Sequence, residues 1–563
     1  MTGTDDALDV LIIGAGPTGL ALAAQLRAYR ARFRIVDRLL DRAHESRALG
    51  VQARTLEILE QFDLGEKLVA RGRTTTNIMV HFEDRIARAQ LGGFGAADTR
   101  FPFILFVSQA ETEALLGEYL ASHDVKVERG LELARLEADE DQVRCVLRHP
   151  DGRTEEVRTR YVVGCDGAHS TVRHEAGIPF VGGDYLEDFV LGDVEADGPI
   201  ERDTLHAFAG RHGFAMFFPL GTPTTWRIIA MQPVSASKAT DAPFTSALSL
   251  GELQEIVDGA TSGVLRLHDP AWLTHFRLHH RQTARYRSGR IFLAGDAAHI
   301  HSPVGAQGMN TGIQDAWNLG WKLALVARGQ ADPRLLDTYE AERWPVGRLL
   351  LRTTDRAFTL FSRVMSAGAI AAWLRREVAA RILPAVLVSA RLRARAFRFV
   401  SELDIRYRKS PAVAEGSPKL EAGLVAGDRL PDGGILRDGQ STFLQKELSG
   451  PRFHLLLCGS PGEWDAGQLL VLRSRYAGLL AIHTLTRADQ AGELIDPTGA
   501  VFARLGVRDA AQYLVRPDGH VGYRCAGRDL AGVTSYLARW LCGAVESLVV
   551  TGGEAPEDAS AAT

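Results

Sequence analysis

Three glycines near the N-terminus have the spacing that brings a backbone against a pyrophosphate. Gly14, Gly16 and Gly19 form a G-x-G-x-x-G pattern. The first glycine permits a tight turn, the second leaves room for the phosphates, and the third lets a helix pack closely on a strand. Asp37, after the next apolar run, can accept a hydrogen bond from a ribose hydroxyl. The pattern predicts a dinucleotide site and leaves open whether NAD or FAD binds there.

A second combination of carboxylate and glycines lies far along the chain. Gly295-Asp296 follows an apolar run, and the loop PVGAQGMN then leads into a long helical pattern. A carboxylate at the end of a buried strand, followed by a loop that opens a helix, predicts a second ligand-facing position. The free N–H groups of residues 308–310 would face an anion or a carbonyl group.

The elements around these motifs predict a parallel α/β sheet. Val10–Ile13 is apolar enough for a buried strand before the first motif, and a helical pattern follows it. Ser108 and Glu111 have the spacing of a capping box at the start of another helix. Arg47 and Arg54 lie before and within a helix expected from about Gln52. Each arginine could bind a phosphate or be solvated, and the spacing favours neither.

Composition and charge narrow the class of protein. The chain of 563 residues is 46% hydrophobic and 24% charged, which is typical of globular domains, and its net charge of -4 gives no reason to expect nucleic acid or an anionic membrane as partner. The five cysteines contain no C-x-x-C, which favours reduced thiols in a cytoplasmic enzyme over disulfides or a metal site. Arginines interrupt the apolar stretch 369–400, which predicts an amphipathic helix and no membrane span. No signal peptide is expected.

Residues 180–282 change to β-type patterns and predict an inserted sheet domain. In the strand expected at 213–220, Met216, Phe218 and Leu220 share one face by the period of two. These side chains could line a ligand pocket or belong to a core.

Together, three motifs resemble those of the single-component (class A) FAD-dependent aromatic hydroxylases, especially phenol and chlorophenol monooxygenases and aromatic polyketide hydroxylases. They are the glycine motif, Asp166-Gly167 in GCDGAHSTVR, and Gly295-Asp296 with the PVGAQGMN loop. The likeness covers nearly the whole chain. It implies an α/β fold with a Rossmann-type FAD-binding domain, an inserted β-sheet substrate domain like that of hydroxybenzoate hydroxylase, and a C-terminal thioredoxin-like domain.

The resemblance implies these domain boundaries: 1–80, 104–179 and 283–360 for FAD binding; 81–103 and 180–282 for the substrate sheet; 361–409 for a helical connector; 410–552 for the thioredoxin-like domain; and 553–563 for a disordered tail.

The resemblance also implies roles for individual residues. The FAD-binding set is Gly14, Gly16, Thr18, Gly19, Asp37, Arg38, Arg47, Gln109, Asp166, Gly295, Asp296, Gly308, Met309 and Asn310. Within it, Asp37 would bind the adenosine ribose, Arg47 the pyrophosphate, and residues 308–310 the flavin pyrimidine edge. Ala306 departs from the usual P-x-G-G-Q-G-M-N loop. If that position requires φ > 0, alanine costs about 1 kcal/mol there.

Catalytic candidates are fewer. The resemblance puts Pro303 beside the reactive flavin face and Arg227 near the flavin. His206, His212 and Tyr185 could supply the base that activates a phenol, or could be structural. In the hydroxybenzoate enzymes the strand matching 213–220 presents polar groups, including an arginine, whereas Met216, Phe218 and Leu220 are apolar. This favours a neutral, bulky aromatic substrate.

The reaction implied by the resemblance is NAD(P)H-dependent hydroxylation of a phenolic or polycyclic aromatic compound. NADPH or NADH would bind transiently and reduce FAD, and O2 would form a flavin C4a-hydroperoxide that transfers OH. Baeyer–Villiger oxygenation of a polyketide by the same architecture stays open. A halogenase is disfavoured because no W-x-W-x-I-P occurs, and a simple NAD-dependent dehydrogenase because of the second and third motifs. The C-terminal module suggests a homodimer or a stabilising domain.

Overall fold

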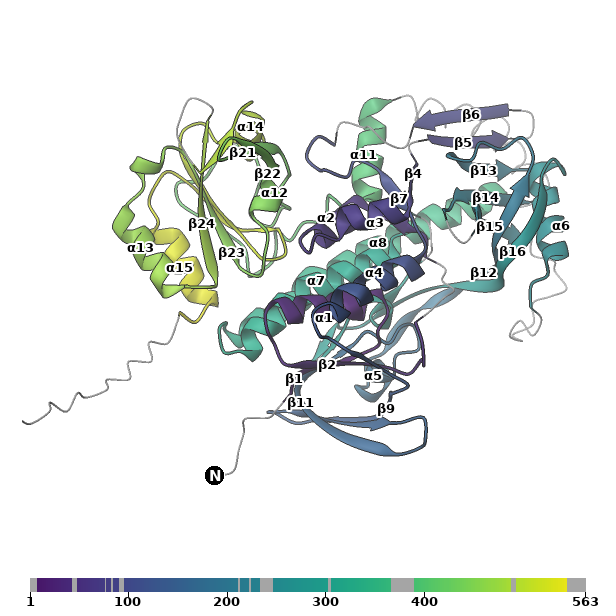
Figure 1. The fold of residues 1–563 in the computed structure, drawn as a ribbon, viewed down its shortest axis with the longest axis horizontal. Coiled ribbons are helices and arrows are strands. Elements are labelled where there is room, and N and C mark those ends of the chain that lie inside the picture. Colours follow the sequence, from purple (N-terminus) through teal and green to yellow (C-terminus); the bar gives the residue numbers. More distant parts are fainter. Residues whose placement is uncertain are drawn as a thin grey trace, which may run out of the picture.

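The computed structural model describes most of the chain. The described residues are 8–42, 48–75, 77–82, 85–90, 96–210, 213–221, 224–232, 247–301, 305–365, 389–487 and 493–543. They form three eight-stranded sheets and one three-stranded sheet (β3, Gly50–Val51; β7, Ile104–Phe106; β4, Arg73–Thr75). Figure 1 shows the three large sheets as separate lobes joined by long central helices.

The first large sheet is mainly parallel. Its order is β17 (Arg287–Ser288), β18 (Ile291–Leu293), β11 (Thr154–Gly164), β1 (Leu8–Ile13), β2 (Phe33–Asp37) and β8 (Val127–Arg129), with β10 (Val143–Arg148) and β9 (Glu132–Ala138) continuing antiparallel from β11. The helix α1 (Pro17–Ala28) begins at Gly16 and packs against α4 (Gln109–Ala121) and α7 (Gly308–Ala327). The predicted cap of α4 is confirmed, because the Ser108 hydroxyl accepts a hydrogen bond from the Glu111 N–H at 3.3 Å.

The register of this sheet brings the three motifs to one edge. Ile13 pairs with Gly164, and Gly164 pairs with Leu293, all in parallel strands. Each of these residues ends its strand and is followed directly by one motif. The carboxyl ends of neighbouring parallel strands are where open α/β sheets bind ligands.

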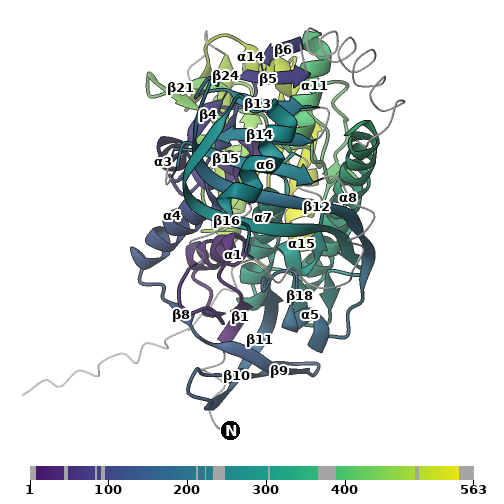
Figure 2. The same cartoon turned by 90° about the vertical axis from the view of Figure 1, so that its right-hand side faces the viewer.

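The second large sheet corresponds to the predicted insertion. Its order is β19 (His299–Ile300), β16 (Arg266–Thr283), β12 (Phe180–Asp197), β15 (Trp226–Gln232), β14 (Phe214–Pro219), β13 (Leu205–Ala209), β5 (Asn77–Phe82) and β6 (Arg85–Gln90). Figure 2 shows these strands stacked across the view, with α6 (Leu250–Thr261) in front of them. Residues 77–80 were predicted to belong to the flavin domain, but β5 pairs along its length with β13 and places them in this sheet.

The two faces of the second sheet have different partners. Leu253 and Val257 of α6 pack against Ala215 and Phe217. On the opposite face, Phe358 of α8 (Asp337–Met365) joins the cluster that includes Met216. The predicted alternation along β14 is therefore confirmed, and the Met216 face points towards the central helices.

The third large sheet is the thioredoxin-like domain. Its order is β20 (Ala414–Glu415), β27 (Val521–Ala526), β26 (Ala511–Val515), β23 (Phe453–Cys458), β24 (Leu480–Arg487), β25 (Leu494–Asp496), β21 (Gly434–Arg437) and β22 (Gln440–Phe443). Its helices are α12 (Leu444–Glu447), α13 (Ala466–Arg475), α14 (Ala500–Leu505) and α15 (Ala531–Trp540). Gly519, with φ 78°, forms the turn of the β26–β27 hairpin.

That hairpin inserts buried charges between the first and third lobes. Arg516 donates to both oxygens of Glu342 on α8, at 2.6 and 2.8 Å, and pairs with Asp518. Lys322 on α7 contacts the same Glu342 at 2.7 Å. Arg54 on α2 (Ala53–Glu60) donates to the Asp518 carbonyl at 2.6 Å and to Glu57 at 2.9 Å. Both sequence alternatives for Arg54 are therefore wrong, since it is buried in an interdomain ion network.

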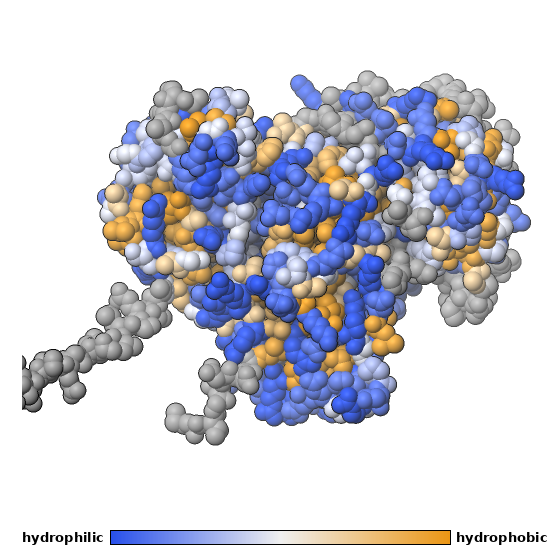
Figure 3. Space-filling model, viewed as in Figure 1, coloured by the Kyte–Doolittle hydropathy of each residue, from blue (hydrophilic) through white to orange (hydrophobic). Residues whose placement is uncertain are grey.

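Other predicted segments are described only in part. Of the helix expected at 369–400, α11 (Ala390–Val400) is described, whereas residues 369–388 and the tail 553–563 lie outside the described residues. None of the described helices has the length and apolar character needed to cross a membrane. Figure 3 shows an apolar patch over α13, where Leu470 and Val471 are 66% and 60% exposed.

Candidate flavin and substrate site

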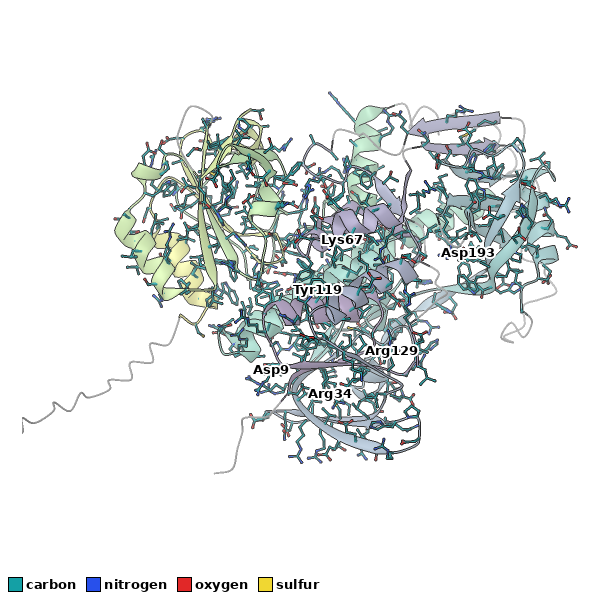
Figure 4. The ribbon with its side chains drawn as sticks, viewed as in Figure 1. Asp9, Arg34, Lys67, Tyr119, Arg129 and Asp193 are labelled. Carbon is teal, nitrogen blue, oxygen red and sulfur yellow. The ribbon has the colours of Figure 1, made fainter. Side chains whose placement is uncertain are left out.

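An open cleft lies at the motif-bearing edge of the first sheet. Residues from the first and second motifs and from β2, α4 and β8 line it, among them Gly14, Gly16, Asp37, Arg38, Gln109, Arg129 and Asp166. Figure 4 marks Arg129 at this edge, well away from Asp193 in the second sheet. Three residues of the predicted FAD-binding set, Asp37, Arg38 and Gln109, are thus brought together around one cavity.

The motifs contact one another through their glycines. A Cβ on Gly14, which has φ 102°, would overlap the Cys165 carbonyl and lie 2.8 Å from Cα of Asp166. A Cβ on Gly19 would overlap the Gly14 carbonyl. Thr18 lies against the third motif, where its side chain would meet a Cβ added to Gly295 at 2.5 Å. Around Gly16, by contrast, an added Cβ would meet nothing within 4 Å, so this position borders open space.

Two of the acidic residues that line the cleft, Asp37 and Asp166, accept hydrogen bonds from backbone N–H groups. Asp37 accepts from the N–H of Ala15 at 2.6 Å and of Leu39 at 2.8 Å, which fixes its carboxylate beside the glycine loop. Asp166 caps α5 (Thr171–Glu175), accepting from the Ser170 hydroxyl at 2.5 Å and the Thr171 N–H at 2.7 Å. Burial raises the pKa of Asp166. Both carboxylates therefore shape the cleft as well as line it.

The third motif contacts the first motif through Thr18 and ends at the start of α7, and its residues are not among those that line the cleft. Asp296 is exposed in the 3-10 turn Gly295–Ala297. Gly308, Met309 and Asn310 form the first turn of α7, whose N–H groups have no acceptor within the helix. The Asn310 side chain does not point to a ligand, because it accepts from the Gln52 N–H at 2.8 Å and donates to the Gly50 carbonyl at 2.8 Å.

Gln52 is a site residue that the sequence did not indicate. It is fully buried, its Nε2 donates to the Gly305 carbonyl at 2.8 Å, and its backbone contacts Asn310. Its Oε1 has no hydrogen-bond partner among the described residues. An orphaned buried acceptor is costly unless a ligand supplies a donor. A flavin pyrimidine ring, which carries an N–H between two carbonyls, fits this requirement.

Asp315 is a second unpredicted residue and connects the third motif to the central helices. It is fully buried and accepts from the Gly295 N–H at 3.1 Å, from His299 Nε2 at 2.7 Å and from Arg343 Nε at 2.6 Å. Arg343 and His299 hold the pKa of Asp315 below its usual range against the effect of burial. The position of the Gly295-Asp296 turn therefore depends on a charged α7–α8 contact.

Ala306 takes the conformation for which glycine is usual. Its φ is 53°, in the left-handed region, so the position does require φ > 0 and the expected cost of alanine applies. We expect Ala306→Gly to raise the unfolding free energy by up to about 1 kcal/mol, because glycine adopts this conformation without a Cβ clash. Chemical denaturation of the flavin-loaded protein measures the change. Ala114→Gly, within α4, is the matched control and should destabilise, since its helical backbone gains nothing from glycine. A loss of stability in Ala306→Gly as large as the control's would contradict the assignment.

Arg227 links the second sheet to the loop that precedes β3. Its guanidinium donates to both oxygens of Asp193 at 2.7 and 2.6 Å and to the Ala48 carbonyl at 3.1 Å. Arg227 is 1% exposed and Asp193 4%. The positive charge on this face of the sheet is therefore neutralised within the protein, and Arg227 fixes the sheet over the loop that leads to Gln52.

The apolar face of β14 continues into the flavin domain. Leu220 and Phe218 cluster with Leu49 and Phe106. Met216 and Phe218 are only half-buried. Together they leave an apolar surface between the second sheet and the loop before Gly50.

His206 lies on the other face of the second sheet from Met216. Its ring contacts His81 at 3.0 Å and the Glu201 carbonyl at 3.0 Å, next to Trp226 and Phe208. The structure therefore does not bring His206 together with the Met216 face. His212, Pro303 and Arg47 lie outside the described residues, as does the Tyr185 side chain.

We expect the His81–His206 pair to make the stability of the protein sensitive to acid. Burial lowers the pKa of His206, and burial with the neighbouring His206 lowers that of His81 to about 4. The fold favours the neutral form of both rings. Their contribution to the free energy of unfolding is therefore complete above about pH 6.5, the pKa of histidine in an unfolded chain, and is lost as the pH falls towards 4. We expect the denaturation midpoint to fall over this interval, and to fall less in His81→Gln. An equal slope in the two proteins would rule out the pair as its source.

Comparison with known proteins is consistent with this geometry. A family described as "FAD binding domain" matches residues 7–354. A 6-methylpretetramide 4-monooxygenase from Streptomyces rimosus is 36% identical over 95% of this chain and 93% of its own. The chain belongs to the single-component FAD-dependent aromatic hydroxylases. It is a flavoprotein monooxygenase that uses FAD.

Solved structures of this family extend the likeness over the C-terminal domain. Anhydrotetracycline hydroxylase from Streptomyces rimosus superimposes with a TM-score of 0.72 and 32% identity over 94% of this chain and 98% of that one. A ternary complex of aklavinone-11 hydroxylase with FAD and aklavinone gives 0.72 and 25% over 96% and 99%. The thioredoxin-like lobe is thus part of the family fold.

Proposed function

We propose that this monooxygenase uses NADPH or NADH and O2 to hydroxylate a large, uncharged polycyclic phenol. The observation that carries the proposal is the Arg227–Asp193 pair. An arginine on the substrate face could bind a benzoate carboxylate, but here Asp193 and Ala48 occupy its guanidinium. The surface beside it, formed by Met216, Phe218 and Leu220, is apolar.

The roles proposed for individual residues combine the positions described above with the resemblance to the family, on which the role of Arg47 depends alone. The glycine loop and Arg47 would hold the pyrophosphate, Asp37 and Arg38 the adenosine, Gln109 and Asp296 the ribityl chain, and the first turn of α7 the pyrimidine edge. When bound, FAD would supply the redox chemistry, which is the transfer of electrons from NAD(P)H to O2. The sheet face would orient the substrate and exclude water from the reacting atoms.

The names of the relatives agree with a large substrate, since they refer to 6-methylpretetramide, anhydrotetracycline and aklavinone. Burying one further aromatic ring contributes about 1.5–3 kcal/mol, which is roughly a tenfold to hundredfold preference. We therefore propose a multi-ring phenol over a single-ring phenol such as a chlorophenol. The homodimer expected from the sequence stays a prediction, with the α13 patch as its candidate surface.

The test is NAD(P)H oxidation by the FAD-loaded protein, with H2O2 recorded alongside. Anhydrotetracycline should accelerate oxidation and suppress H2O2, whereas 4-hydroxybenzoate should do neither. Acceleration by 4-hydroxybenzoate alone would contradict the proposed pocket. A lactone product would instead assign Baeyer–Villiger oxygenation, the alternative that the architecture also permits.

A further inference from the structure

Glu402 is a buried carboxyl group behind the flavin-binding turn of α7 that no motif includes. It follows α11, is 2% exposed and has φ 60°, a left-handed conformation that a non-glycine residue rarely adopts. Such strain persists only where surrounding contacts enforce it. Glu402 lines neither the cleft beside the glycine motif nor the face of β14 that carries Met216 and Phe218.

The contacts that enforce this conformation reach the start of α7. One Glu402 oxygen accepts from the Thr311 hydroxyl at 3.0 Å, and the other accepts from the Gln314 side-chain amide. Gln307, just before the helix, donates to the Phe399 carbonyl at 3.3 Å. Segment 399–402 therefore contacts α7 on both sides of Gly308–Asn310.

The charges around Glu402 leave it without an ion pair among the described residues. From α8, Arg343 faces the site, but its guanidinium donates to Asp315, to the Tyr407 hydroxyl and to the Thr311 carbonyl. From α7, the Asp315 carboxylate adds negative charge. Burial is the largest effect on Glu402 and raises its pKa to about 8, with Asp315 acting in the same direction and Arg343 opposing.

We propose that Glu402 is a positioning residue that holds the first turn of α7 against the flavin and takes up a proton when the flavin is reduced. This rests on the flavin contact proposed above for residues 308–310. Two-electron reduction by hydride leaves a negative charge on the flavin pyrimidine ring, next to these residues. Thr311, which contacts Glu402, is the next residue along the helix.

The two negative charges then oppose one another. A carboxylate close to a new negative charge is disfavoured, so its pKa rises on reduction and it binds a proton from solvent. Above about pH 8, where Glu402 is a carboxylate before reduction, the balance is one hydride to FAD and one proton from solvent to Glu402. The N-terminus of α7 then stabilises the flavin charge without competition from a second anion.

The test is an equilibrium redox titration of FAD in the holoenzyme between about pH 6.5 and 9.5, without aromatic substrate. In the wild type we expect one proton per two electrons below about pH 8, where Glu402 is already neutral, and two protons above it. Glu402→Gln should take up one proton throughout. Asp404→Asn, a more exposed carboxylate two positions away, is the control and should behave as the wild type.

Measuring the affinity for FAD separates the positioning role of Glu402 from its uptake of a proton. Glu402→Ala leaves Thr311 and Gln314 without their acceptor and should weaken FAD binding roughly tenfold, whereas Glu402→Gln should restore it. A wild-type slope of one proton over the whole range overturns the inference, and so does an unchanged slope in Glu402→Gln. A wild type that binds no FAD would overturn the flavin site itself, whereas absence of hydroxylation with normal titrations would overturn only the proposed substrate.

Discussion

Gly16→Ala is expected to lower the affinity for FAD about a hundredfold while leaving the stability of the flavin-free protein unchanged. Gly16 has φ -75°, which alanine adopts readily, and an added Cβ would meet no protein atom within 4 Å. The space it would enter is where we propose that the pyrophosphate approaches the backbone, at the N-terminus of α1. Losing one or two charge-assisted hydrogen bonds there costs about 2–3 kcal/mol.

Substitutions at two other glycines serve as controls for this prediction. Gly117→Ala in α4 also adds a Cβ into open space, but away from the cleft, and should leave FAD affinity unchanged. Gly19→Ala would overlap the Gly14 carbonyl and should destabilise the flavin-free protein as well. Fluorescence titration with FAD and denaturation of the three flavin-free variants provide the comparison. Wild-type FAD affinity in Gly16→Ala would show that the pyrophosphate lies elsewhere.

Arg516→Ala should cost about 3–5 kcal/mol of unfolding free energy and release FAD at lower temperature. The substitution leaves Glu342 and Asp518 buried with too little positive charge, and removing one partner of a buried ion pair is strongly destabilising. Glu342 lies on α8, and Lys322 of the same network lies on α7, whose first turn is proposed to contact the flavin. The effect should therefore reach the cofactor.

Arg528→Ala is the matched control in the same domain. Arg528 pairs with Glu463 at 2.6 Å and Asp509 at 3.1 Å, but it is partly exposed, so its loss should cost under about 1 kcal/mol. Denaturation followed by tryptophan and flavin fluorescence measures both variants. Similar costs for Arg516→Ala and Arg528→Ala would show that the hairpin does not secure the lobes to each other.

The sequence predicted those parts of the site whose chemistry is local. The glycine spacing, the acids at strand ends and the alternation along β14 each lie within a short segment, so their geometry follows from backbone periodicity. Arg54 was misjudged because its partner Asp518 belongs to a different lobe. Gln52 and Asp315 went unnoticed for the same reason, since Gly305, Asn310 and Arg343 reach them only through the tertiary fold.

His206 shows what residue type and strand periodicity do not determine. Its residue type suggested a base, but the parity of β13 and its pairing with β14 turn its ring to the α6 side of the sheet. Period-two alternation assigns residues to faces and does not say which face meets the cofactor. In this protein Arg227 and the cluster of Phe218 and Leu220 with Leu49 and Phe106 join the Met216 face to the segment before β3.

The most direct test of the central claim is turnover of a tetracyclic phenol under O2 labelled with oxygen-18, with the product solved by mass spectrometry and NMR. The account predicts one labelled oxygen atom as a new hydroxyl on an aromatic ring, with one NAD(P)H consumed per product and little H2O2. A product without label, or consumption of O2 that appears wholly as H2O2 with every polycyclic phenol offered, would contradict it.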